Sequence, residues 1–171
     1  MTPAELLTEA CQRVLQTSTG AVDGLTVEQL THRPEPDTNP IGWLVWHLAR
    51  VQDDHVADVA GTEQVWTGQG YADRFGLPLD VADHGYGHTG EQVGLVRAPA
   101  DLLADYHRAT HEASVAYLAG LSAHDLDRVV DERWDPPVTL GVRLVSIVDD
   151  EIQHAGQAAY ARGLLDARNR T

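Results

Sequence analysis

Apolar residues recur at every third or fourth position along four long stretches of the chain, which is the spacing of amphipathic helices. These stretches predict helices over residues 3–17, 40–60, 99–121 and, from a cap at Thr139, to about residue 165. Two shorter helical turns are expected after Thr26 and Thr89, because a glutamine three positions later can complete a capping box in each case. No stretch alternates convincingly enough to predict a strand.

Each predicted helix has one face that we expect to be buried. On the helix over residues 99–121 that face consists of Leu102, Tyr106, Ala109, Ala113, Ala116 and Tyr117. His107 and His111 lie off it and are expected to be an exposed pair. Cys11 lies on the apolar stripe of the first helix, so it is expected to be a buried structural thiol and not a reactive one.

Four long helices without strands predict an all-α protein, folded as a four-helix bundle in a single domain over residues 1–171. The glycine-rich link over residues 61–98 is too long for a tight hairpin. It therefore indicates a long crossover between the second and third long helices.

Composition excludes several kinds of function. The formal net charge of −14 disfavours nucleic acid as a partner, since phosphate binding needs a positive surface. All 12 basic residues are arginine, which excludes lysine Schiff-base chemistry and a P-loop lysine. The single cysteine excludes an intrachain disulfide and a multi-cysteine zinc site. Without a signal sequence or a long apolar run, no membrane span is expected, and we expect a cytoplasmic protein.

Nine histidines are many for this length, and two of them suggest a metal site. His47 lies on the core-facing stripe of the second long helix, where an imidazole needs a partner. On the last helix, Asp150 and His154 are four residues apart and share one face. These three side chains would form a three-ligand site with one open position, a catalytic pattern. Glu151 is a competing carboxylate ligand that the sequence does not exclude.

Two simpler interpretations of these residues remain open, both without a metal ion. His47 can be a core histidine bonded to a neighbouring carbonyl or hydroxyl group, and the acidic run 149–151 can be a solvated helix face. Elsewhere, Trp43 and Trp46 flank His47 in sequence but should point away from it, toward the core or a dimer partner. Tyr86 and His88, in a glycine-rich loop, can contact a substrate.

Three segments resemble the DinB-like superfamily, near its mycothiol-dependent maleylpyruvate isomerase and thiol S-transferase branch. They are residues 41–50 (IGWLVWHLAR), 86–92 (YGHTGEQ) and 151–163 (EIQHAGQAAYARG), and the resemblance covers nearly the whole chain. It implies an up-down-down-up bundle, a homodimer, and one divalent ion on His47 and His154. At position 150 many relatives have a further histidine, whereas this chain has Asp150. The mycothiol-dependent branch also has a carboxylate at this position.

The resemblance also implies a function. Zinc is the expected ion and nickel the alternative; replacing an imidazole by a carboxylate makes the site harder and so leaves the identity of the metal more open. The implied cosubstrates are mycothiol, as the thiol, and a small electrophile, with the reaction a thiol S-transfer or isomerisation. Arg143 can meet a carboxylate of the thiol. The alternatives are a metal- or small-ligand-binding protein without catalysis, and an interaction bundle without any ion.

Overall fold

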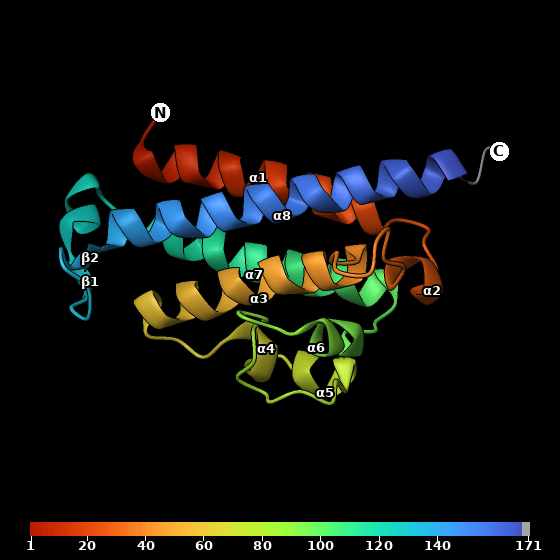
Figure 1. Ribbon diagram of the computed structural model, residues 1–171. Coiled ribbons are helices and arrows are strands. Elements are labelled where there is room, and N and C mark those ends of the chain that lie inside the picture. The colour runs from red at the N-terminus through yellow and green to blue at the C-terminus, as the bar shows by residue number, and fades with distance from the viewer. Residues whose placement is uncertain (169–171) are drawn as a thin grey trace.

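The computed structural model describes residues 1–168, and four long helices form its body (Figure 1). In chain order, the first and the last long helix run in one direction along the bundle, and the second and the third run in the opposite direction (Figure 1). This confirms the predicted all-α bundle with an up-down-down-up course. The helices are α1 (Pro3–Val22), α3 (Ile41–Ala60), α7 (Ala100–Ala119) and α8 (Leu140–Arg168).

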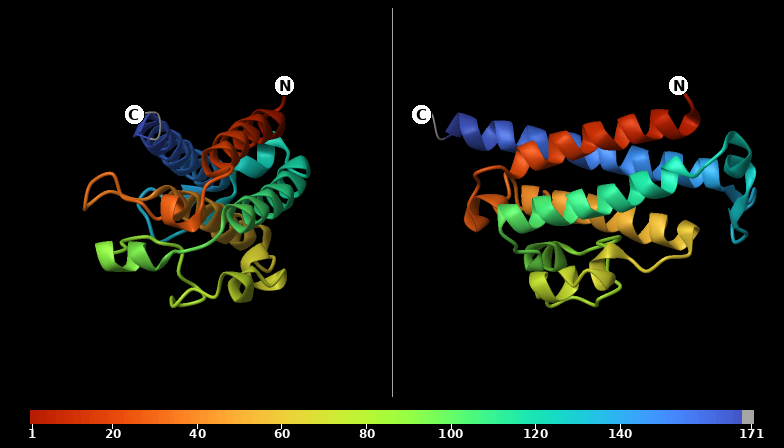
Figure 2. Two further views of the ribbon diagram at one scale, coloured as in Figure 1. Left: turned by 90° about the vertical axis from the view of Figure 1, so that its right-hand side faces the viewer. Right: turned by 180° about the vertical axis from the view of Figure 1, so that it is seen from behind.

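The bundle has two layers, with α1 beside α8 and α3 beside α7 (Figure 2). Because α3 and α7 are parallel, the chain between them must return along the bundle. This is the long crossover that the sequence predicted. This segment packs outside the second layer and covers α3, whose residues are therefore buried on nearly every side from Ile41 to Asp53. It contains three short helices, α4 (Val65–Gly68), α5 (Tyr71–Phe75) and α6 (Gly90–Leu95).

The ends of the helices follow from local chemistry. Thr26 and Thr89 form the predicted capping boxes at α2 (Val27–Leu30) and α6. Gly61 ends α3 in the left-handed conformation, with φ of 67°. α1 continues five residues beyond its predicted end at residue 17, because Ser18, Ala21 and Val22 are buried and tertiary packing outweighs weak helix propensity.

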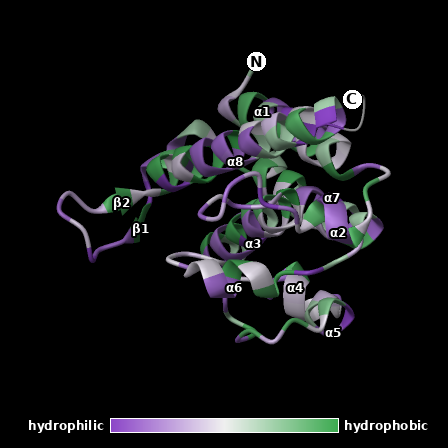
Figure 3. Ribbon diagram, turned by 45° about the vertical axis from the view of Figure 1, so that its right-hand side comes forward, coloured by the Kyte–Doolittle hydropathy of each residue, from purple (hydrophilic) through white to green (hydrophobic). Residues whose placement is uncertain are grey.

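One small sheet was missed by the sequence analysis. After the 3₁₀ helix η1 (Ala123–Asp127), β1 (Val129–Asp131) pairs antiparallel with β2 (Val138–Thr139). Strands of three and two residues are too short to show a period of two, so the pattern could not reveal them. The hairpin projects from one end of the bundle (Figure 3) and leads directly into α8, whose Val142 amide bonds to Thr139 Oγ1 at 3.4 Å.

The interior contains two apolar clusters. The larger one is built around α3, where Trp46, Leu44 and Leu48 are at most 2% exposed. The smaller one fills the other end of the bundle with Cys11, which is 4% exposed, and with residues of α7 and α8. The buried structural thiol is thereby confirmed. Across residues 1–168, none of the helices has the combined length and hydropathy needed to cross a membrane.

The predicted buried face of α7 was correct in part: Tyr106 is buried and Leu102, Ala109 and Tyr117 are partly buried against the core, but Ala113 and Ala116 are exposed. His107 and His111 are 0% and 7% exposed, whereas Ala113 and Ala116 line an open cleft of about 510 Å³ between α3 and α7. The reason is that α7 buries polar side chains, which a search for apolar residues ignores. His107, for example, has a buried hydrogen bond of 2.8 Å between its Nδ1 and the Ser18 hydroxyl.

The burial of His107 predicts an acid-sensitive fold. Burial, and to a smaller extent nearby His111, lowers the pKa of His107 from 6.5 to about 3. Between these values the unfolded chain binds a proton that the folded chain does not. The stability due to neutral His107 is therefore fully present above pH 6.5 and is lost toward pH 3, by at most about 1.4 kcal/mol per pH unit.

Urea unfolding of the metal-free protein at pH 7 and at pH 4.5 tests this. The variant His107→Gln should be less stable at pH 7 but should lose about 2–3 kcal/mol less than the wild type on acidification. His124→Gln, at an exposed histidine, is the control and should follow the wild type. If acidification lowered the free energy of unfolding equally in the wild type and in His107→Gln, the low pKa of His107 would be contradicted.

Candidate metal centre

The antiparallel packing of α3 against α8 brings the three predicted metal ligands together. His47 Nε2 lies 3.8 Å from Asp150 Oδ1, and His154 Nε2 lies 3.5 Å from the same oxygen. One ligand atom from each residue lies within 4.8 Å of the other two. The i, i+4 spacing of Asp150 and His154 on α8 produces their half of the cluster, as the sequence predicted.

Hydrogen bonds outside the cluster determine which nitrogen of each imidazole faces inward. His47 Nδ1 bonds to the backbone carbonyl oxygen of His84, and a carbonyl only accepts, so Nδ1 carries the proton. His154 Nδ1 bonds to Gln157 Oε1 at 3.0 Å in the same sense. Both Nε2 atoms can therefore direct a lone pair toward Asp150, and such outer hydrogen bonds are typical of metal-binding histidines.

The electrostatics of the cluster fit a bound cation. Burial, the largest influence, lowers the pKa of His47 and keeps its imidazole neutral. Burial also opposes protonation of His154, but bonds to Asp150 and Gln157 outweigh it and raise the His154 pKa. Asp150 Oδ2 is buried without a hydrogen-bond partner among residues 1–168. Two inward lone pairs beside a carboxylate repel one another unless a proton or a metal ion lies between them.

Trp43 is part of the site, contrary to the prediction that it points away from His47. Its indole stacks on the His47 ring with centroids 4.5 Å apart and an interplanar angle of 12°. It also meets the His154 ring edge-on at 6.0 Å. Trp43 and His47 are four residues apart on α3 and so share a face, a spacing that could have revealed the contact. Trp46 packs into the core, which is one of the two positions that the sequence analysis predicted for it.

The competing carboxylate, Glu151, points away from the cluster. It is 0% exposed and lies beside Cys11 in the bundle interior. Burial and the neighbouring Asp150 raise the pKa of Glu151 well above its ordinary value, so the protein interior favours its neutral form. The acidic run 149–151 is therefore divided between a solvated side chain, a cluster member and a buried acid, because successive helical residues point about 100° apart.

The three predicted cosubstrate contacts occupy different positions. Tyr86 is 87% exposed, in the loop that passes over His47. The His88 side chain is 3% exposed and bonds to Trp43 and Asp83. Arg143 is 16% exposed and is engaged by His55 at 3.0 Å and Asp131 at 3.2 Å. The structure thus brings Tyr86 and His88 near the cluster and leaves Arg143 in a separate ion-pair network.

The fold and the cluster define a four-helix bundle with a His–Asp–His group between α3 and α8. Residues 6–167 match the model of the mycothiol-S-transferase family, and the chain belongs to this family. The relationship that the sequence motifs predicted is thereby confirmed. A solved structure, described as that of a conserved protein from Enterococcus faecalis, is similar with a TM-score of 0.91. It is 32% identical, over 98% of this chain and 99% of that one. Comparison with curated proteins finds no match.

The different environments of Asp150 and Glu151 predict different results for two neighbouring substitutions. Asp150→Asn removes the negative charge of the cluster and should abolish stoichiometric zinc binding at pH 7. Glu151→Gln keeps the size and shape of a buried side chain outside the cluster and supplies the neutral form that burial favours, so it should retain zinc and change stability by no more than about 1 kcal/mol. Metal analysis after gel filtration and urea unfolding measure both effects, and loss of zinc only in Glu151→Gln would reverse the assignment.

Proposed function

We propose that this protein is a divalent-metal-dependent mycothiol S-transferase that joins the thiol sulfur to a small electrophile. The observation that carries this proposal is the convergence of His47 Nε2, His154 Nε2 and the Asp150 carboxylate inside a bundle of the mycothiol-S-transferase family. Zinc is the proposed ion, with nickel as the alternative, because imidazole and carboxylate ligands suit both.

The sulfur must come from a small molecule. Cys11 is the chain's single cysteine and is 4% exposed. Burial and the neighbouring Glu151 raise its pKa to about 12, so it is a poor nucleophile at neutral pH. Cys11 is also on α1, in the interior cluster, and is not among the side chains that form the His–Asp–His group. A cosubstrate thiol is therefore the chemically reasonable source.

The residues of the cluster have separate tasks in this proposal. A divalent ion held by them supplies a Lewis acid that lowers the pKa of a coordinating thiol. His47 and His154 provide neutral nitrogen ligands, because their Nδ1 protons are held by carbonyl oxygens. Asp150 provides one negative charge. The Trp43 ring covers one face of His47 and excludes water there. The remaining exposure, 30% at Asp150 and 19% at His154, is the proposed side of substrate entry.

A groove beside the cluster is the proposed location of the body of the thiol. It has a volume of about 650 Å³, which is the size of an ordinary small-molecule site. Leu44 and Gln157 line one part of it, and Gln157 is also the residue that holds His154. Among the predicted contacts, Tyr86 is the best exposed to meet a bound thiol. His88 and Arg143 would first have to leave their present partners.

Turnover with defined thiols tests the proposal. The zinc-loaded protein should accelerate the consumption of mycothiol in the presence of a chromogenic electrophile such as 1-chloro-2,4-dinitrobenzene, and should be less active with glutathione. Chelation or Asp150→Asn should reduce kcat/KM by at least about 100-fold, since each removes the Lewis acid. Stoichiometric zinc binding with no thiol-dependent turnover of any electrophile would instead support the non-catalytic, metal-binding alternative.

A homodimer is also part of the proposal. The outward face of α8 has three large apolar side chains at helical spacing, with Val142 54%, Val145 63% and Ile152 54% exposed. Exposed apolar patches of this kind commonly mark protein interfaces. In sedimentation velocity the wild type should be a dimer and Val145→Glu with Ile152→Glu a monomer. Val81→Glu, at an equally exposed valine of the linker, should stay dimeric, and a monomeric wild type would remove the proposal.

A further inference from the structure

His47 is held from two directions besides the cluster. Its Nδ1 edge meets the His84 carbonyl oxygen, and its flat face is covered by Trp43. Both contacts depend on residues 83–88, which we call the clamp loop. This loop belongs to the long linker between α3 and α7, far from the metal-ligand motif in sequence.

Asp83 and His88 close the clamp loop on itself. The Asp83 carboxylate accepts the Gly85 amide at 2.8 Å and faces His88 Nε2, with both oxygens 2.9 Å away. His88 Nδ1 accepts the Trp43 indole N–H at 3.1 Å. An indole only donates, so His88 Nδ1 must be the acceptor and Nε2 carries the proton given to Asp83. This chain of hydrogen bonds determines the orientation of the Trp43 ring.

Gly85 shows how closely the clamp loop approaches His47. A Cβ atom at this position would lie 2.7 Å from His47 Nδ1 and 3.1 Å from the Trp43 ring. The residue also has φ of 95°, a conformation that other residues rarely adopt. The backbone of the loop is therefore in direct contact with the imidazole and its stacking partner.

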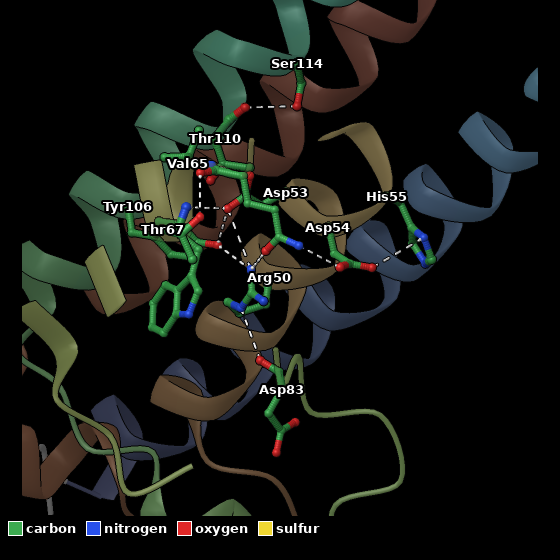
Figure 4. A network of polar contacts seen from close by, with 12 residues as sticks. Arg50, Asp53, Asp54, His55, Val65, Thr67, Asp83, Tyr106, Thr110 and Ser114 are labelled. Carbon is green, nitrogen blue, oxygen red and sulfur yellow. Dashed lines mark hydrogen bonds and ion pairs between the residues drawn. The ribbon is translucent and has the colours of Figure 1, made fainter. Parts of the chain in front are cut away.

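The clamp loop is also tied to the core. Arg50 Nε donates to the Asp83 carbonyl oxygen at 3.2 Å (Figure 4). Arg50 is 0% exposed, and its other contacts include Tyr106 at 3.2 Å and an ion pair of 3.6 Å with Asp53. Asp53 in turn accepts the backbone amides of Val65 and Trp66. The first turn of the linker and the clamp loop are thus attached to the same buried network on α3.

We propose that Asp83 and His88 are positioning residues for the metal centre. They hold the His84 carbonyl against His47 Nδ1, which keeps Nε2 available, and they hold Trp43 flat against the imidazole. The inference rests on the proposed metal function and deepens it. Removing such outer hydrogen bonds typically weakens metal affinity by about 10–100-fold.

Binding of Co²⁺, followed by its visible absorption bands, tests the inference independently of catalysis. His88→Leu removes both hydrogen bonds and should weaken Co²⁺ binding by about tenfold or more and change the band positions. His88→Gln offers an amide oxygen to Trp43 and an amide N–H to Asp83, so it should restore most of the affinity and the wild-type bands. Val81→Ala, at an exposed position just before the loop, is the matched control and should bind as the wild type does.

Trp43→Phe provides a second test if His88→Leu does not fold. Phenylalanine keeps a ring over His47 but cannot donate to His88, so the Co²⁺ bands should shift and the affinity should fall. In a double variant with His88→Leu the two losses should not add, because both remove the same hydrogen bond. If the wild type binds no Co²⁺, the metal proposal fails and this inference with it. If the wild type binds Co²⁺ but Trp43→Phe and His88→Leu do so with wild-type affinity and bands, only the positioning role is overturned.

Discussion

The packing of α3 against α8 places lone pairs opposite lone pairs inside the protein. His47 Nε2, His154 Nε2 and the Asp150 carboxylate all direct electron density at one small volume. Such an arrangement is unfavourable unless a positive charge occupies that volume. A proton on His154 can do so, in keeping with its raised pKa, and the proposed divalent cation would do so with greater charge. The chemistry proposed for the protein depends on this one electrostatic conflict between two helices.

The linker between α3 and α7 has a role beyond connecting parallel helices. It buries the outer side of α3 and brings the His84 carbonyl to His47 and the His88 ring to Trp43. The buried Arg50 and Asp53 hold the clamp loop and the start of α4, respectively, on the same helix. A charged pair in an apolar core is tolerated when it has polar partners: both oxygens of Asp53 and two nitrogens of Arg50 have them, and the Arg50 guanidinium also lies over the Trp66 ring. The polar interior therefore connects the fold of the linker to the geometry of the candidate site.

Sequence analysis succeeded where information is local. The period of the apolar residues predicted α3 and α8, and the i, i+4 spacing placed Asp150 beside His154. The analysis was wrong where a contact depends on a distant partner. His107 was expected to be exposed but is bonded to Ser18 from another helix. The Trp43 ring was expected to point away, yet it covers His47 and is held there by His88 from the linker.

The sequence by itself determined the four long helices, the caps at Thr26, Thr89 and Gly61, the identity of the candidate ligands and the family, since these depend on short-range spacing and on motifs within single segments. Only the tertiary structure decided between Asp150 and Glu151. The two residues are adjacent in the chain, but the rotation of α8 in the bundle turns one toward His47 and the other toward Cys11. That rotation is a result of packing against three other helices, and no single segment contains the information for it.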